Sequence, residues 1–287
     1  MNAVSVENLS YIYSPGTPFE KRAVDNMSIA IEKGSIVGII GHTGSGKSTF
    51  IQHLNGLLKP TEGTVRINGQ DIWADPKKIR EFRFKVGLVF QYPEYQLFEE
   101  TVEKDIAFGP KNMGLSDEEI SERVFEAAQF VGLPREVLSR SPFELSGGQR
   151  RRAAIAGVLA MRPEVLVLDE PTAGLDPGGR DAILTQIENY HKKSGNTTLL
   201  VSHSMEEVAR FTQKVAVIND GKLFAYGSVG EVYSRADELS AMGLSVPQVS
   251  QIFAELHARG YNVSTDIYTV EDACRELASL IKKGGVR

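Results

Sequence analysis

Gly41-His42-Thr43-Gly44-Ser45-Gly46-Lys47-Ser48 is the most informative stretch of this 287-residue sequence. Residues 35–40 before it are mostly apolar and β-branched and predict a strand, whereas Phe50, Ile51 and Leu54 after it have helical spacing. The glycines let successive backbone N–H groups turn toward phosphate oxygens, and the following helix directs the positive end of its dipole at them. This strand, loop and helix predict a nucleotide phosphate site of the P-loop type.

Residues of this loop are expected to bind the nucleotide in different ways. Lys47 neutralises the terminal phosphates, and the Ser48 hydroxyl is a ligand for Mg²⁺, which prefers oxygen. Further nucleotide contacts are predicted for Gly41, His42, Thr43, Gly44, Ser45, Gly46 and Thr49. A chance glycine-rich turn is the alternative, but the flanking strand and helix argue against it. A dinucleotide site is not predicted, because no third glycine follows Gly46 at the required spacing.

Two adjacent carboxylates, Asp169 and Glu170, follow the apolar strand Val165 to Leu168. Ligands bind at the carboxyl ends of strands in open parallel sheets, and side chains alternate along a strand. We therefore expect Asp169 to hold Mg²⁺ through its water shell and Glu170 to accept a proton from the attacking water. His203 ends another apolar strand and is expected to polarise the γ-phosphate and this water. The alternatives are a solvated acidic turn and a histidine that merely ends its strand.

The order of apolar runs predicts an α/β fold with a largely parallel sheet over the first three quarters of the chain. The predicted strands are Ser35–Ile40, Val86–Phe90, Val165–Leu168, Thr198–Ser202 and Val215–Ile218. Ser116 is predicted to cap a helix, with Glu119 completing a capping box. After Tyr226 the pattern becomes mostly helical, so residues 228–287 are predicted to form a separate small domain.

Two helices are expected in that last segment. The first has the apolar stripe Val249, Ile252, Phe253 and Leu256 and stops at Gly260. The second starts near Thr269, with Asp272 in the capping position.

Composition narrows the classes of partner. Lys and Arg number 32 and Asp and Glu 37, and 32 − 37 gives a net charge of −5, which offers no general attraction to nucleic acid or anionic lipid. Cys274 is the only cysteine, so an internal disulfide is excluded. No apolar run is long enough to span a bilayer, and no signal segment is visible. We expect a cytoplasmic protein that reaches a membrane only through another polypeptide.

Leu145-Ser146-Gly147-Gly148-Gln149 resembles the signature motif of the ABC ATPases. It lies 146 − 47 = 99 residues after Lys47 and 169 − 146 = 23 residues before Asp169, in the order that this family has. The hydroxyl of Ser146 and the N–H groups of Gly147 and Gly148 begin a predicted helix, which is an anion-binding end. The resemblance implies that Ser146 to Gln149 contact ATP bound to a second subunit, so that one chain lacks half of each site.

The same resemblance assigns further residues. Gln91 is the Q-loop glutamine that contacts Mg²⁺, His203 is the switch histidine and Asp176 belongs to the D-loop that crosses between subunits. Tyr13 resembles the aromatic residue that stacks on adenine, although Tyr11 is an alternative and either ring can instead face the core. The implied cofactors are ATP and Mg²⁺. The implied ATPase domain is 1–227, with a helical subdomain at about 92–160.

A narrower resemblance is to the energy-coupling factor ATPases, formerly grouped with cobalt-transport ATPases. It rests on residues 11–19, on Phe90 to Phe98 and on Gly243 to Pro247 with the helices around it, which suit a domain that joins the ATPases to one another. Such transporters combine two similar ATPases with a transmembrane coupling protein and a membrane substrate-binding protein for vitamins or metal ions. The resemblance therefore implies a peripheral position on the cytoplasmic side of the cell membrane.

Residues 154–161 and 169–176 look more like the second ATPase of such a pair, so a heterodimer is implied, while the sequence leaves a homodimer open. Tyr92, Tyr95 and Phe98 are predicted to line the groove for the coupling protein, with buried packing as the alternative.

Rival functions leave different signs in a sequence. A DNA-repair ATPase carries a long coiled coil between the P-loop and the signature, but residues 48–145 have no sustained heptads. A ribosomal ATPase of this class has two cassettes in one chain, and this chain has one. An ordinary importer ATPase is opposed only by residues 90–98 and the C-terminal segment. Arg150 to Arg152 are interpreted as a solvated or salt-bridged helix face.

Overall fold

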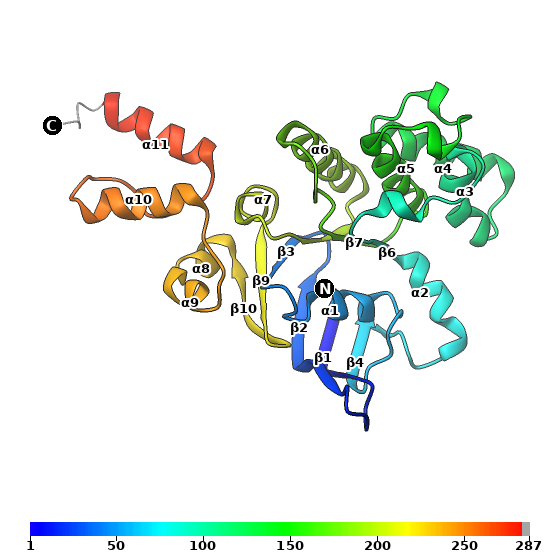
Figure 1. The fold of residues 1–287 in the computed structure, drawn as a ribbon, viewed down its shortest axis with the longest axis horizontal. Helices are drawn as coiled ribbons and strands as arrows, with labels where there is room; N and C mark the ends of the chain where they lie inside the picture. Colours follow the sequence, from blue (N-terminus) through cyan, green and yellow to red (C-terminus); the bar gives the residue numbers. More distant parts are fainter. Residues whose placement is uncertain (283–287) are drawn as a thin grey trace.

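The computed structural model describes residues 1–282, and its larger β-sheet has six strands (Figure 1). They are β3 (Ile36–Ile40), β6 (Val86–Val89), β7 (Val165–Asp169), β8 (Thr197–Val201), β9 (Lys214–Asn219) and β10 (Lys222–Ser228). Their order is β10-β9-β3-β8-β7-β6, parallel except for β10. All five predicted strands are confirmed. Their unbroken apolar runs follow from burial on both faces, since every residue of β3, β6, β7 and β8 is buried.

A second, antiparallel sheet packs against this one and was not predicted from the sequence. It contains β1 (Asn2–Tyr13), β2 (Lys21–Glu32), β4 (Glu62–Ile67) and β5 (Gln70–Asp71) in the order β2-β1-β4-β5. Helix α1 (Lys47–Leu54) buries Phe50 and Ile51 in the core that joins the two sheets. The phosphate loop therefore emerges between the sheets.

A group of helices lies at one end of the long axis of the molecule (Figure 1). It contains α3 (Val102–Asn112), α4 (Asp117–Phe130) and α5 (Gly147–Leu159), follows α2 (Ile79–Lys85), and shares a core with β7, β8 and α6 (Pro177–Ser194). The Ser116 hydroxyl caps α4 by accepting from the Glu119 N–H, as predicted. The capping box itself is wrong, because the Glu119 carboxylate binds Arg123 at 2.7 Å. An arginine one turn along the helix offers a charged partner, which a backbone N–H does not.

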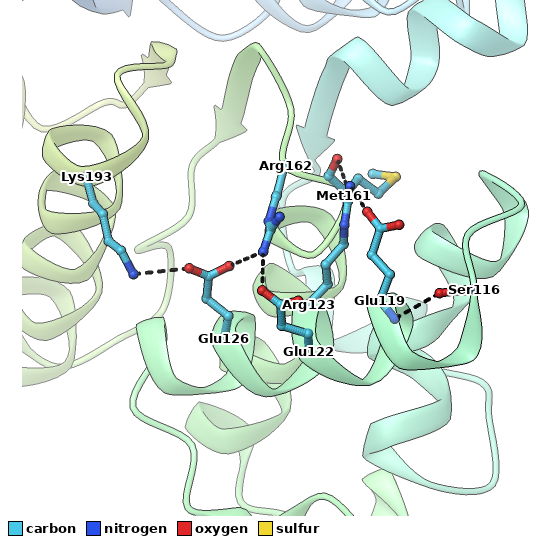
Figure 2. A network of polar contacts seen from close by, with 8 residues as sticks. All are labelled: Ser116, Glu119, Glu122, Arg123, Glu126, Met161, Arg162 and Lys193. Atoms are coloured by element: carbon cyan, nitrogen blue, oxygen red, sulfur yellow. Dashed lines mark hydrogen bonds and ion pairs between the residues drawn. The ribbon is translucent and has the colours of Figure 1, made fainter.

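Helix α4 is joined to the rest of the molecule by the outer ion-pair cluster, which consists of Glu122, Glu126, Arg162 and Lys193 (Figure 2). Arg162, just before β7, lies 2.7 Å from Glu126 and 3.4 Å from Glu122, and Lys193 of α6 lies 3.1 Å from Glu126. All four side chains are partly exposed, so each pair contributes about 0–1 kcal/mol. The cluster therefore adds little to the stability of the fold.

The last helices divide into two pairs. Helices α8 (Val229–Tyr233) and α9 (Ala236–Ala241) pack on β9 and α7 (Met205–Phe211). Helices α10 (Gln248–Ala258) and α11 (Val270–Lys282) have a small core of their own around Phe253 and lie at the opposite end of the molecule from α3 to α5 (Figure 1). The predicted boundary at residue 228 stays a prediction, and the last five residues of that segment, 283–287, lie outside the described residues.

The predicted end of the first of these helices and the predicted start of the second agree with α10 and α11. Gly260 has φ +88° after α10, and the Thr269 hydroxyl accepts from the Asp272 N–H at 3.1 Å to begin α11. Within the apolar stripe of α10, Phe253 is buried, whereas 56% of Ile252 is exposed. Among residues 1–282, no helix has both the length and the apolar character that a membrane span requires.

Candidate active site

The phosphate loop connects β3 to α1 in a conformation that needs glycine. Gly46 has φ +105°, and a Cβ added there would lie 2.5 Å from the carbonyl oxygen of Ala23. Lys47 is buried, and its Nζ donates to the carbonyl oxygens of Gly41 at 2.7 Å and His42 at 3.0 Å. Burial lowers the pKa of Lys47, although the nearby carboxylates of Glu170 and Asp169 act in the opposite direction. Its hydrogen bonds go to neutral carbonyls, so a phosphate would supply the counter-charge that these lack.

Asp169, the last residue of β7, lies in the same site as this loop. Its carboxylate is buried and lies near the Ser48 hydroxyl. Burial raises the pKa of Asp169, the charge of Glu170 adds to this effect, and Ser48, Lys47 and His203 oppose it. Two carboxylates that repel each other beside a hydroxyl make an oxygen-rich site that an added divalent cation would stabilise. This donor set fits Mg²⁺.

Glu170 follows in a left-handed conformation, with φ +50°, and its N–H donates to the carbonyl oxygen of Val201 at 3.0 Å. Its carboxylate lies between two residues that follow other strands. Nε2 of His203, after β8, is 2.6 Å from Oε1, and Nε2 of Gln91, after β6, donates to Oε2 at 3.0 Å. Three of the residues predicted from the sequence therefore meet, and the amide oxygen of Gln91 is left for another ligand.

The signature segment begins α5 and faces outward. Ser146 and Gln149 form a capping box, in which the Ser146 hydroxyl accepts from the Gln149 N–H at 3.3 Å and the Gln149 side chain accepts from the Ser146 N–H at 3.1 Å. A Cβ added at Gly147 or Gly148 would meet no heavy atom within 4 Å. Within residues 1–282, no hydrogen bond joins Ser146 or Gln149 to the phosphate loop.

The two tyrosines near the loop have different surroundings. Tyr13 is 37% exposed, and its hydroxyl lies 3.3 Å from the Thr49 hydroxyl. Tyr11 is half-buried against the core, and its ring centroid lies 4.8 Å from that of His53. Tyr13 is therefore the more exposed of the two rings.

Two other predicted residues lie at the edges of the site. The His42 ring lies between the loop and Asp220, with Nδ1 2.9 Å from the carbonyl oxygen of Thr43 and Nε2 3.5 Å from Oδ1 of Asp220. Asp176 stands at the N-terminal cap of α6 without a capping hydrogen bond from its side chain.

The basic run differs in part from the sequence interpretation, and only Phe98 of the three aromatic residues predicted to line a groove does so. Arg151, in the basic run, is 3% exposed and pairs with Glu94. The predicted salt bridge is therefore confirmed, but a solvated face is wrong for this residue. Sequence reasoning missed Glu94, because the two are 57 positions apart. Phe98 lines a largely apolar groove of about 310 Å³ together with Phe108, Gly157 and Met161, while Tyr92 and Tyr95 are exposed.

A phosphate loop, an acidic strand end and a separate helix start with Ser-Gly-Gly, on two packed sheets with a helical subdomain, define an ATP-hydrolysing protein of the ATP-binding cassette class. The family described as ABC transporter matches residues 24–173, more than half of the chain. The chain belongs to this family and, within it, to the energy-coupling factor transporter ATP-binding proteins.

The narrower membership follows from similarity over the whole chain. The energy-coupling factor transporter ATP-binding protein EcfA2 of Clostridium perfringens is 54% identical over 98% of this chain and 99% of its own length. Its namesake in Listeria innocua is 52% identical, again over 98% and 99%.

Solved structures of ATP-binding cassette proteins have a similar fold. The structure of cbiO1 from Clostridium perfringens, described as part of the ABC transporter complex cbiONQ, has a TM-score of 0.75 and 36% identity and covers 88% of this chain and 99% of its own. A dimeric post-hydrolysis state of the ATP-binding cassette MJ0796, bound to ADP and Pi, has a TM-score of 0.71 and 29% identity, over 79% and 98%.

Proposed function

We propose that this ATPase powers the uptake of a micronutrient, a vitamin or a metal ion, from a site that it shares with a second, similar ATPase. The observation that carries the proposal is the separation of the two halves of the site. The phosphate loop, Asp169, Glu170, Gln91 and His203 lie together, whereas Ser146 to Gln149 face outward with open space around their glycines. A head-to-tail pair would bring each outward segment to the ATP of the other chain. The dimeric cassette bound to ADP and Pi supports this arrangement.

Within each half-site, Lys47 binds the terminal phosphates and Tyr13 stacks on the adenine. Ser48, Asp169 and Gln91 would hold Mg²⁺, which would neutralise charge on the phosphates when bound. Glu170 accepts the proton of the attacking water, and His203 at 2.6 Å orients that carboxylate. Asp176 faces the second ATPase.

The apolar groove is the proposed contact with a transmembrane coupling protein. Phe98 is 60% exposed there, and Phe108 lies beside it with ring centroids 5.0 Å apart. Exposed aromatic pairs of this kind are favourable anchors for an amphipathic helix. Phe98, which lines the groove, lies only a few residues after Gln91 in the sequence. A movement of the coupling protein would therefore be transmitted to the catalytic site through the segment from Gln91 to Phe98. A membrane substrate-binding protein completes the complex, and this chain lies at the cytoplasmic side of the cell membrane.

ATP hydrolysis measured on three preparations tests this function: the purified chain alone, the chain with the second ATPase, and both ATPases with the membrane proteins in liposomes. We expect little hydrolysis by the dilute chain, more by the pair, and uptake of a labelled vitamin or metal ion only with the complete set. Ser146→Ala is expected to reduce hydrolysis by the pair while this chain still binds ATP. Full activity of the chain as a dilute monomer would contradict the shared site.

A further inference from the structure

Arg151 makes an ion pair inside the molecule, one turn after the start of α5. Its Nε and Nη2 donate to the two carboxylate oxygens of Glu94 at 2.9 and 2.6 Å, in the parallel geometry that a guanidinium and a carboxylate favour. Side-chain exposure is 4% for Arg151 and 12% for Glu94. Glu94 lies in the 3-10 turn Pro93–Gln96, three residues after Gln91. The pair therefore fixes the segment Gln91–Gln96 to the signature helix.

The remaining nitrogen of Arg151 reaches a third segment. Nη1 donates to the carbonyl oxygen of Ala173 at 2.6 Å and to that of Pro171 at 3.3 Å. These residues follow Glu170 directly, and the Ala173 N–H donates back to the Glu170 carbonyl oxygen at 3.1 Å. One guanidinium thus joins the turn that carries Glu170, the signature helix and the segment that carries Gln91.

Stability alone does not account for this arrangement. A buried ion pair is often no more stabilising than two apolar side chains of similar size, because both charges lose their water. Burial by itself would raise the pKa of Glu94, but the hydrogen bonds and the charge of Arg151 outweigh it and hold the pKa below its ordinary value. The pair is therefore ionised. Only an arginine offers enough donors in a fixed plane to bind a carboxylate and two carbonyls at once.

We propose that Arg151 is a positioning residue for ATP hydrolysis, because it holds Glu170, the signature helix and the segment Gln91–Gln96 as one unit. The proposal rests on the function proposed above. If Arg151 joins these parts, a shift at the apolar groove would move two of them together. These are the turn that carries Glu170 and the signature segment Ser146 to Gln149, which is proposed to contact the ATP of the second ATPase.

The test compares variants in the reconstituted complex with the second ATPase and the membrane proteins. Arg151→Met alone leaves Glu94 buried without a partner and is expected to lower the Tm. The double variant Glu94→Leu with Arg151→Met removes both charges, and its Tm is expected to return to near the wild-type value. Its kcat is expected to stay about 10- to 100-fold low, with KM for ATP and the affinity for a non-hydrolysable analogue unchanged, because only the alignment is lost. Arg151→Lys is expected to recover part of kcat.

Arg162→Met is the matched control, because Arg162 also joins the helical subdomain to the core but lies in the outer ion-pair cluster. Its kcat is expected to equal that of the wild type. Wild-type kcat in the folded double variant, or an equal loss of kcat in Arg162→Met, would overturn the proposal. If the double variant does not fold, Arg151→Lys decides: wild-type kcat overturns the proposal, and a lower kcat at unchanged Tm and KM supports it. Absence of hydrolysis in the wild-type complex would instead count against the proposed function.

Discussion

Replacing Glu170 by Gln tests the assignment of the general base, and the geometry of the site makes this substitution specific. Glutamine has the same shape, and its amide oxygen can still accept from Gln91, which now donates at 3.0 Å. Its NH₂ group can face Nε2 of His203, now 2.6 Å from the carboxylate, if that nitrogen carries no proton. The backbone at φ +50° and its hydrogen bond to Val201 do not depend on the side chain. The change therefore removes a proton acceptor and little else.

The expected effects on rate and on stability differ in size. Loss of a general base lowers the turnover number by about 10²- to 10⁴-fold, which corresponds to about 2.7–5.4 kcal/mol of activation free energy. The contact with His203, whose side chain is 45% exposed, is worth about 0–1 kcal/mol of folding free energy. A large fall in hydrolysis with almost no change in Tm is therefore expected.

The assay measures phosphate release by the complex together with binding of ATP. Glu170→Gln is expected to bind ATP normally and to accumulate as an ATP-bound pair on size-exclusion chromatography, because ATP still favours the closed state. Glu206→Gln is the matched control, since this nearby carboxylate contacts Ser204 and Gln248 rather than the site. Near-normal hydrolysis by Glu170→Gln would refute the assignment of the base.

Two further predictions follow from burial and exposure. The pKa of Asp169 is raised in the folded chain, so its negative charge destabilises the nucleotide-free fold. The protonated form is favoured by folding. This stabilisation is complete below the ordinary aspartate pKa and is lost as the pH rises through the raised pKa. Asp169→Asn is thus expected to raise the Tm at pH 7 but not in acid; melting curves at several pH values check this, and a lower Tm at pH 7 would contradict it. Tyr13→Ala is expected to weaken ATP binding by about 5- to 150-fold, from a lost stacking energy of about 1–3 kcal/mol, whereas Tyr11→Ala should mainly lower Tm. Calorimetric titration and melting distinguish the two variants, and the reverse pattern would assign the base contact to Tyr11.

The sequence predicted the parallel sheet because its strands are short and buried on both faces, which leaves continuous apolar runs such as Val165 to Leu168. It did not predict the antiparallel sheet. There β1 changes register several times along β2, at points such as Leu9 and Tyr11, so no regular alternation is visible. Its other partner, β4, begins at Glu62 and is a long-range neighbour. Sequence patterns record burial along a segment, but they do not record which distant segment pairs with it.

For the catalytic site, the sequence predicted the residues that follow strands, but it did not predict contacts between residues far apart in the sequence. Glu170, His203 and Gln91 each follow an apolar strand, and the parallel order of those strands brings them to one edge. Of the three consecutive arginines, Arg151 is the buried one, and its partners Glu94, Pro171 and Ala173 are all distant in the sequence. No local pattern carries that information.

Beside the apolar core that it shares with β7, β8 and α6, the helical subdomain makes ion pairs of two kinds: the outer ion-pair cluster joins it to Arg162 and Lys193, and the Arg151–Glu94 pair lies within it. Salt screens charges over about 8 Å at physiological ionic strength and acts mainly on exposed pairs, such as the outer ion-pair cluster. The Arg151–Glu94 pair is buried and is screened much less. Rising ionic strength therefore weakens the outer ion-pair cluster more than it weakens the Arg151–Glu94 pair. The contacts that attach the signature helix to the catalytic turn are thus the less salt-sensitive ones, because they radiate from the buried guanidinium of Arg151.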